Sequence, residues 1–357
     1  MLGDTFGIGQ LFALSRDPVI CVRGGTVLSM NPPAVNLFGG DRTGCNAAQL
    51  LPETILSAES ERFIAGTVVN GQNVTVSCGT WEDVRMYSFI IPAPAENQTA
   101  DRAISSSLRE LTNTIKATTD QILVLSERYQ DEKLSRYTAI LKHSSCRLKR
   151  LIMNYSLVDD CLRGIQAFSP VTASVNAVCR DMADMVSDLA AERNIRVEFR
   201  DTEEIYASMD VVLIQQMLLN LLCNSLQNAP ENSTIRLSLS ATDKFVSIMV
   251  ADEGGGIAPE VLAELFRQYE LPPDLHTGRF SAGLGLAVAN SIARLHDGAI
   301  IVNSTPGHGC VIAARIRRST DRRMMSPRED YRSVLTDAVL TQLSPWLTWK
   351  DYLHTGD

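Results

Sequence analysis

The sequence has no apolar run that approaches the roughly 18–20 residues of a membrane-spanning helix. Its first residues lack the cationic start and apolar core of a signal peptide. The eight cysteines include no C-x-x-C pair and lie mostly in apolar segments, as reduced core cysteines do. These absences predict a cytoplasmic protein without a transmembrane segment.

Positive charge is not in excess either. The 357 residues include 33 Lys and Arg against 41 Asp and Glu, a net charge of −8. Binding to duplex nucleic acid needs a basic face, so nucleic acid is not expected as a main partner. Apolar residues make up 45% of the chain and charged ones 21%, which is the ordinary balance of a globular protein of two or three domains.

Residues 1–95 are rich in short β-like runs separated by turns, a pattern that predicts a small sheet domain. The runs are PVICVRGG, TVLSMNPP, NVTVSCGT and VRMYSFII. The Pro-, Ala- and polar-rich stretch PAPAENQTADR that follows them is typical of a linker into a helix.

Residues 96–162 are predicted to form a hairpin of two long amphipathic helices, because proline and glycine are absent from about 103 to 160. The charged segment ERYQDEK separates two apolar stripes. The stripes are Ile104, Leu108, Leu111, Ile115, Ile122 and Leu125, then Leu134, Tyr137, Leu141, Leu148, Leu151, Ile152 and Tyr155. Such a hairpin buries its stripes by pairing with a second copy or by packing on the chain's own domains, and we expect a homodimer.

Helices and strands alternate over residues 163–318, which predicts a two-layer α/β sandwich. The whole chain is therefore expected to be an α+β multidomain protein. Residues 319–357 are predicted to form a helical tail. Its apolar stripe, which docks on the sandwich or on a partner, consists of Tyr331, Val334, Leu335, Leu340 and Leu343.

One helix of the sandwich, VVLIQQMLLNLLCNSLQN, is apolar on almost every face. The exception is Gln216, Asn220, Asn224 and Gln227, whose spacing of 4, 4 and 3 places their amides on a single face. Buried amides need hydrogen-bond partners. A ligand with phosphate oxygens and a hydrated Mg²⁺ would supply them, and so would an internal hydrogen-bond network.

Further chemistry-bearing residues follow at regular intervals. Asp252 closes an apolar strand about 28 residues after the second of these asparagines, and Gly254 and Gly256 follow it. The carboxylate can accept a hydrogen bond from an exocyclic amine such as that of adenine. Gly283 and Gly285, about 30 residues later, open a helix whose N-terminal amides suit phosphate. The irregular segment ELFRQYELPPDLHTGRFS between them is expected to be a lid over a nucleotide.

This order of motifs resembles the GHKL ATPase domain of sensor histidine kinases, a superfold that also serves gyrases, mismatch-repair proteins and a heat-shock chaperone. The resemblance implies ATP and Mg²⁺ as ligands, with Asn224 as the Mg²⁺ ligand and Asp252 as the adenine-reading residue. Gly307 and Gly309 match the family's final glycine pair. The nucleotide-binding residues that it implies are Asn220, Asn224, Gln227, Asp252, Gly254, Gly256, Gly283 and Gly285. Gln227 departs from the family, which usually has a phosphate-contacting lysine there, so we expect weaker nucleotide binding.

The segment DPVICVRGGTVLSMNPPAVNLF, residues 17–38, resembles the opening of a PAS sensor domain, in which a strand and turn lead into an N-x-x-A helix. PAS domains bind haem, flavin, small metabolites or nothing. No histidine or cysteine is placed here to indicate a cofactor, and none is assigned.

In the resembled family the first hairpin helix carries S-H-E-L-R-T-P-L-x-x-I, whose histidine accepts the phosphoryl group. Ser106 takes the place of that histidine, Ser107 that of the adjacent acid, and Glu110 the position used for phosphatase chemistry. An imidazole is a neutral nucleophile near pH 7, whereas a serine hydroxyl without a base is a poor one. His143, flanked by Ser144 and Ser145, is interpreted as a solvated or interface histidine rather than a second acceptor.

These features together predict a sensor histidine kinase-like protein of a two-component system that binds ATP and Mg²⁺ and is degenerate for autophosphorylation. Its expected partners are a second copy of the chain and a response regulator or partner kinase. The alternative is a non-catalytic dimeric scaffold that regulates a true histidine kinase or response regulator. A third possibility keeps the kinase activity but moves the acceptor to a histidine or serine of a partner.

Overall fold

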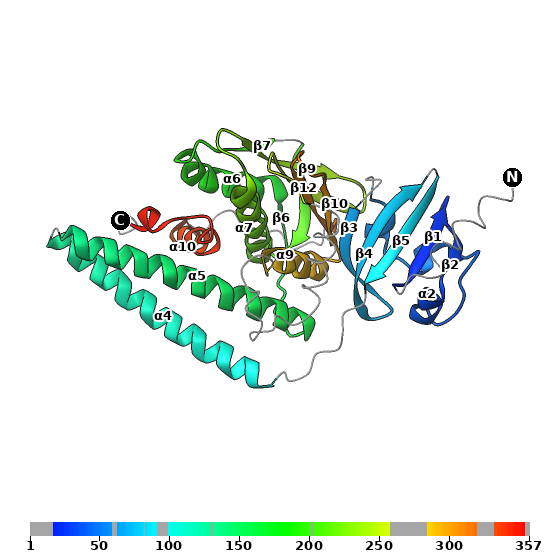
Figure 1. Cartoon of the computed structure of the whole chain (residues 1–357), viewed down its shortest axis with the longest axis horizontal. Coiled ribbons are helices and arrows are strands. Elements are labelled where there is room, and N and C mark those ends of the chain that lie inside the picture. The colour runs from blue at the N-terminus through cyan, green and yellow to red at the C-terminus, as the bar shows by residue number, and fades with distance from the viewer. Residues whose placement is uncertain are drawn as a thin grey trace.

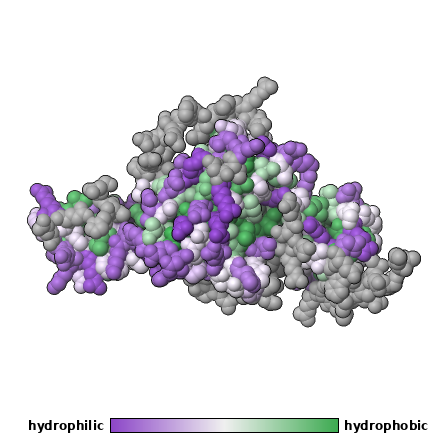
Figure 2. Space-filling model, turned by 90° about the horizontal axis from the view of Figure 1, so that it is seen from above, coloured by the Kyte–Doolittle hydropathy of each residue, from purple (hydrophilic) through white to green (hydrophobic). Residues whose placement is uncertain are grey.

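The computed structural model describes residues 17–58, 63–81, 83–90, 99–129, 131–200, 203–257, 284–319 and 332–353. The strands β1 to β5, between residues 19 and 90, lie at the right, and the two long helices α4 (Thr99–Arg128) and α5 (Glu132–Leu162) run along the lower left (Figure 1). Seen from above, hydrophilic residues cover much of the described surface, with hydrophobic patches between them (Figure 2). Within these ranges no helix combines the length and the hydropathy needed to cross a bilayer.

The N-terminal residues form a five-stranded antiparallel sheet in the order β2-β1-β5-β4-β3. The strands are β1 (Val19–Arg23), β2 (Thr26–Met30), β3 (Phe63–Val69), β4 (Gln72–Trp81) and β5 (Val84–Ile90). Between β2 and β3 lie α2 (Pro32–Leu37), the short 3₁₀ helix η1 (Ala47–Gln49) and α3 (Glu53–Leu56). The four predicted β-like runs correspond to β1, β2, β4 and β5, and β3 was not predicted.

Asn31 explains how this segment turns from strand to helix. Its side-chain oxygen accepts hydrogen bonds from the backbone amides of Ala34 at 3.0 Å and Val19 at 2.8 Å. The first bond caps α2, and Pro32 and Pro33 suit the start of a helix, where a backbone donor has no partner anyway. The second bond fastens the helix start to β1.

The two predicted long helices are α4 (Thr99–Arg128) and α5 (Glu132–Leu162), which pack against each other. Asp131 caps α5 by accepting the amides of Lys133 and Leu134. Small polar side chains fill part of the seam between the helices. Thr112 and Thr119 are buried there, and each hydroxyl donates to the backbone carbonyl four residues earlier.

The larger apolar side chains of the hairpin mostly point away from this seam. Leu111 is 59% exposed and Leu125 is 47% exposed, and Leu134, Tyr137 and Leu141 are exposed as well. Farther along α5 the stripe becomes buried, at Ile152 and Tyr155. The chain's own domains therefore cover only the second half of the α5 stripe, and most of the α4 stripe that the structure describes stays uncovered.

The second half of the chain forms the predicted sandwich, with helices over one face of a sheet (Figure 1). The helices are α6 (Val175–Ala191), α7 (Val211–Asn228) and α9 (Leu284–Leu295). The strands are β7 (Arg196–Arg200), β9 (Thr234–Ala241), β10 (Phe245–Asp252), β11 (Ala299–Ser304) and β12 (Cys310–Arg317), with β6 (Val171–Ser174) and β8 (Tyr206–Met209) paired separately. Only β7 and β9 among these neighbours run parallel.

The two sheets are continuous, which the sequence did not predict. β3 pairs with β11 through Ala65 opposite Ile301, giving one sheet of ten strands. A Cβ on Gly66 would lie 2.1 Å from the side-chain nitrogen of Asn290, so glycine is needed for α9 to approach β3. The buried Arg315 of β12 donates to the backbone carbonyl of Thr54 at 3.0 Å and so joins the sandwich to α3.

The tail forms α10 (Arg332–Gln342) and the 3₁₀ helix η2 (Trp349–Tyr352), and lies between α5 and the helices α6 and α7 (Figure 1). Leu340 and Leu343 are buried in the sandwich core, as expected for a tail that docks. Tyr331, Val334 and Leu335 of the predicted stripe lie outside the described side chains.

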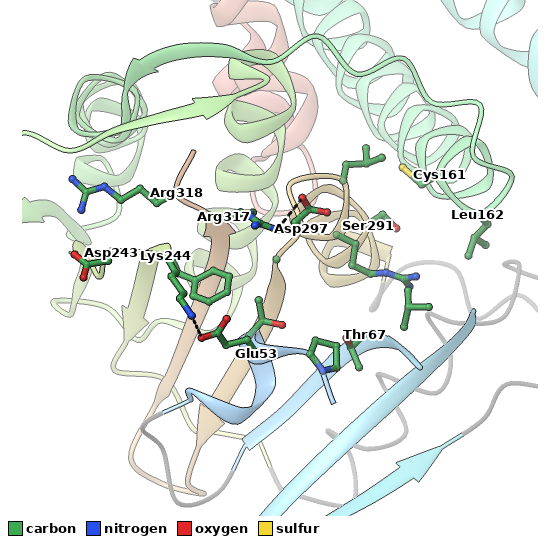
Figure 3. A pocket seen from close by; sticks show the side chains of 17 residues that line it. Glu53, Thr67, Cys161, Leu162, Asp243, Lys244, Ser291, Asp297, Arg317 and Arg318 are labelled. Atoms are coloured by element: carbon green, nitrogen blue, oxygen red, sulfur yellow. Dashed lines mark hydrogen bonds and ion pairs between the residues drawn. The ribbon is translucent and has the colours of Figure 1, made fainter. Parts of the chain in front are cut away.

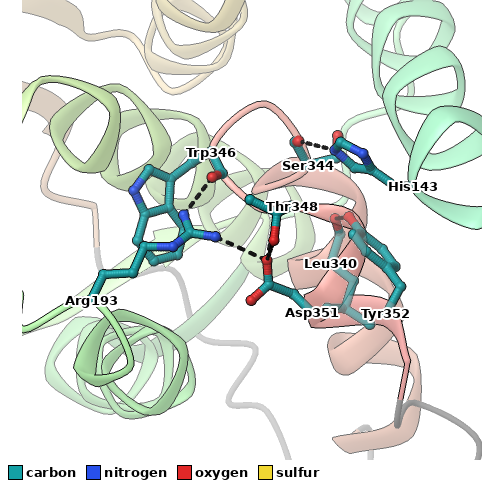
Figure 4. A network of polar contacts seen from close by, with 8 residues as sticks. All are labelled: His143, Arg193, Leu340, Ser344, Trp346, Thr348, Asp351 and Tyr352. Carbon is teal, nitrogen blue, oxygen red and sulfur yellow. Dashed lines mark hydrogen bonds and ion pairs between the residues drawn. The ribbon is translucent and has the colours of Figure 1, made fainter. Parts of the chain in front are cut away.

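Polar contacts fix the tail at both of its faces. Asp337 accepts from Lys116 of α4 at 2.7 Å and from Lys149 of α5 at 2.9 Å. Arg193, which follows α6, donates to Asp351 at 2.9 Å and stacks on Trp346 (Figure 4). The tail thus joins the hairpin to the sandwich.

Candidate nucleotide-binding site

Asp252 is the last residue of β10 and contacts the end of α7. Its Oδ1 accepts the backbone N–H of Gly254 at 3.0 Å, and its Oδ2 accepts the hydroxyl of Ser225 at 3.1 Å. The residue is only 9% exposed, and burial raises the pKa of its carboxyl while these hydrogen bonds lower it in part. A carboxylate has about four lone-pair sites, so capacity remains for the amine of a ligand.

The glycines around Asp252 allow two turns to pack tightly together. A Cβ on Gly254 would lie 2.7 Å from the carbonyl oxygen of Asn228, and one on Gly256 would lie 2.2 Å from that of Thr305. Gly256 also has a φ of +69°, which favours glycine. Both glycines are among the nucleotide-binding residues that the resemblance implies. What the structure shows is that they let backbone approach backbone, and so fix the position of Asp252.

The four predicted amides of α7 differ in their surroundings. Asn220 is fully buried, Gln216 and Asn224 are half-buried, and Gln227 is exposed. The Asn220 side-chain nitrogen donates to the carbonyl of Gln216 at 2.9 Å within the helix. The stripe therefore runs from the core of the molecule at one end to solvent at the other.

The side-chain oxygen of Asn220 meets the hairpin. It accepts hydrogen bonds from Nη2 of Arg150 at 3.2 Å and from Nδ2 of Asn154 at 3.1 Å. Asn154 in turn accepts from Gln216 at 3.4 Å and from Gln342 of the tail at 3.2 Å. Two of the four predicted amides thus take partners from α5, as an internal network requires.

The start of α9 lies against the same groups. A Cβ on Gly285 would lie 3.2 Å from Oδ1 of Asn220, 3.3 Å from Oδ1 of Asn224 and 3.3 Å from Nη2 of Arg150. Gly283 lies outside the described residues. Amide oxygens, a guanidinium and the N-terminal end of a helix therefore converge at one place, a set that suits a hydrated cation and phosphate.

Sequence reasoning missed Ser225, Arg150 and Asn154. Ser225 follows directly after Asn224, but a serine next to a motif carries no signal by itself. The sequence does give a weak signal for Arg150 and Asn154, because they lie four residues apart on α5 and flank the apolar pair Leu151 and Ile152. Polar side chains on one face of an otherwise apolar stretch indicate a polar contact.

The phosphoacceptor position lies in the first part of α4. The Ser106 side chain is outside the described ones, while Ser107 and Glu110 are exposed. His143 of α5 contacts the tail, with its Nε2 3.0 Å from the carbonyl oxygen of Ser344 (Figure 4). This agrees with its interpretation as an interface histidine. In the part of the chain that is described, no group of three or more His, Cys, Asp or Glu is placed to hold a metal ion.

A pocket of about 720 Å³ lies away from Asp252, where the N-terminal sheet meets the sandwich (Figure 3). Its walls carry the Lys244–Glu53 pair at 2.6 Å and the Arg317–Asp297 pair at 4.0 Å. It meets α9 near the end of that helix, through Ser291, rather than at the glycine start. None of the predicted site residues lines it, so this pocket is a feature of the sheet junction.

Part of this chain matches a known protein family, and the chain resembles several known proteins. Residues 209–320 match the family of Histidine kinase-, DNA gyrase B-, and HSP90-like ATPases. The sensor protein CreC of Escherichia coli (strain K12) is 28% identical over 210 residues, 58% of this chain and 44% of CreC. The histidine protein kinase DivJ of Caulobacter vibrioides is 32% identical over 113 residues, 32% of this chain and 19% of DivJ. Residues 209–320 therefore form a domain of this ATPase family, and sensor histidine kinases are among the proteins that the chain resembles.

The chain spans less than half the length of CreC and of DivJ. Among solved structures, full-length ShkA in complex with AMPPNP matches it with a TM-score of 0.47 and 20% identity, over 66% of this chain and 54% of ShkA.

The Asp252 carboxylate gives the first prediction. Asp252→Asn should weaken binding of Mg²⁺·ATP about tenfold or more, because a hydrogen bond to a buried charged acceptor is lost. Because burial raises the pKa of Asp252, wild-type affinity should also fall on acidification at a higher pH than for an ordinary aspartate. Calorimetric titration between pH 7.5 and 5 measures both effects.

Asp243→Asn is the matched control, since Asp243 is an exposed carboxylate far along the same strand pair. It should bind like the wild type. Equal affinities for the wild type and Asp252→Asn would remove Asp252 from the nucleotide site.

Proposed function

We propose that this chain binds Mg²⁺·ATP where α5, α7 and α9 converge and acts as a sensor histidine kinase-like protein of a two-component system. The observation that carries the proposal is the arrangement of Asp252 at one end of the amide face of α7 and Gly285 beside Asn220 and Asn224 farther along it. The family match over residues 209–320 supports it.

Within the proposal each group has a chemical task. Asp252 accepts the adenine amine, the start of α9 takes phosphate, and Asn224 offers its amide oxygen to Mg²⁺, which prefers oxygen ligands and keeps several waters. The bound Mg²⁺ would supply neutralisation of the phosphate charge. Gln227 is exposed and uncharged, so it adds no attraction for phosphate.

The domains are proposed as follows: a PAS-like sensor at 1–95, a dimerising hairpin at 96–162, the ATP-binding domain at 163–318 and a helical tail at 319–357. The β2-β1-β5-β4-β3 sheet and the Asn31 cap support the first. We propose a cytoplasmic location and a response regulator or partner kinase as interaction partner, with nucleic acid playing no part.

The hairpin is proposed to form a homodimer through its uncovered apolar side chains, Leu111 and Leu125 above all. Burying such residues against a second copy removes apolar area from water. Light scattering should give the mass of a dimer, and Leu111→Lys with Leu125→Lys should shift it toward a monomer. A monomer mass for the wild type would remove dimerisation from the proposal.

We propose that the chain does not phosphorylate itself on the family's usual position, because Ser106 lacks an adjacent base. Incubation with γ-labelled ATP should leave no acid-labile label on the wild-type chain. The double variant Ser106→His with Ser107→Glu, which restores an imidazole beside a carboxylate, should become labelled, because the ATP site itself is retained.

The variants separate the rival functions. Label on the wild type that disappears in His143→Gln would overturn the degenerate-acceptor proposal. An unlabelled double variant together with a wild type whose melting temperature is unmoved by millimolar Mg²⁺·ATP would favour the non-catalytic scaffold. The observation that favours the scaffold function is the serine, Ser106, at the acceptor position.

A further inference from the structure

Arg150 of α5 is a buried cation that the proposed function does not use. It is 5% exposed, and its one hydrogen bond in the described structure goes from Nη2 to the neutral oxygen of Asn220. Its Nε is buried and has no partner among the described residues. Within the same residues no carboxylate forms an ion pair with it.

Such a burial is energetically unfavourable. A guanidinium stays protonated in proteins, and its removal from water without an opposite charge destabilises the folded state. Burial lowers the pKa of Arg150, consistent with that cost. A fixed cation with an unused hydrogen-bond donor can bind an anion, and the anion would offset the hydration that the guanidinium has lost.

The guanidinium lies beside the start of α9. Its Nη2 is 3.3 Å from the position of a Cβ on Gly285, and Oδ1 of Asn224 is 3.3 Å from the same point. A side chain at Gly285 would crowd these polar atoms, so glycine lets the start of α9 approach them closely. The N-terminal amides of α9, the Arg150 fork and the asparagine oxygens therefore meet at one place.

This cluster of polar groups lies on the side of the site away from Asp252. Ser225 contacts Asp252, and Asn220 contacts Arg150, and these two residues of α7 are separated by about 7.5 Å of helix rise. A nucleotide whose amine is held at Asp252 therefore extends its phosphates toward Arg150. Gln227, at the position of the family's phosphate lysine, carries no charge and is exposed.

We propose that Arg150 is a polyphosphate-binding residue of the nucleotide site, supplied by the hairpin in place of the missing lysine. This inference rests on the proposed binding of Mg²⁺·ATP. Because α5 carries the phosphate ligand and α7 and α9 carry the rest, nucleotide binding and docking of the hairpin on the sandwich stabilise each other.

The test is calorimetric titration of the full chain with Mg²⁺·ATP and Mg²⁺·ADP. Arg150→Gln should bind Mg²⁺·ATP about tenfold or more weakly than the wild type, and Mg²⁺·ADP should be affected less. Arg150→Lys keeps the charge but loses the two-pronged guanidinium. Its affinity for Mg²⁺·ATP should lie between those of the wild type and Arg150→Gln. Arg147→Gln, an exposed arginine one turn earlier on α5, is the matched control and should bind like the wild type.

The melting temperature of the nucleotide-free chain separates ligand binding from a structural role. Arg150→Gln should melt at the same or a higher temperature, because it removes an unpaired buried charge while Asn154 still donates to Oδ1 of Asn220. A lower melting temperature with unchanged nucleotide affinity would overturn the proposal in favour of a structural contact to Asn220.

The direction of the change in Mg²⁺·ATP affinity also tests the proposal. Tighter binding of Mg²⁺·ATP by Arg150→Gln would also overturn the proposal, and would show that Arg150 competes with Mg²⁺ for the asparagine oxygens. A wild type that binds neither nucleotide would refute the proposed function itself. If the wild type binds Mg²⁺·ATP and Arg150→Gln binds it equally well, only the role of Arg150 is refuted.

Discussion

The structure depends on one oxygen atom, Oδ1 of Asn220, where the hairpin and the sandwich meet. It accepts one hydrogen bond from Arg150 and another from Asn154, so an uncharged amide at the centre of α7 holds two donors of α5. Asn220 is fully buried, and an unsatisfied donor there would cost about 1–3 kcal/mol. The contact fixes how α5 lies across α7 and α9, and thereby which groups surround the glycine start of α9.

The other contacts hold this arrangement from outside. The tail forms ion pairs with both hairpin helices through Asp337 and packs Leu340 and Leu343 into the sandwich core. On the far side, β3 extends the sheet of the sandwich and Arg315 reaches across to Thr54. The uncovered apolar face of the hairpin is a separate surface, so pairing with a second copy leaves the contact at Asn220 intact.

The sequence pattern correctly predicted the features that depend on neighbouring residues in the chain. Alternating β-branched runs gave four strands of the N-terminal sheet, and the all-round apolar character of α7 predicted its burial. The position of Asp252 at a strand end was also correct. The pairing of β3 with β11 was not predictable, because it joins the edges of two sheets more than 200 residues apart in the chain. The same holds for Arg150, whose partner lies 70 residues away and whose own helix shows only a polar position on an apolar face.

The most direct measurement is a crystal structure of the chain with Mg²⁺ and a non-hydrolysable ATP analogue. We expect the adenine amine at the Asp252 carboxylate, Mg²⁺ on the Asn224 oxygen and the end of the phosphate chain at the Arg150 guanidinium, with α5 still against α7. A nucleotide bound away from Asp252, or phosphates that leave Arg150 without an anion, would contradict it.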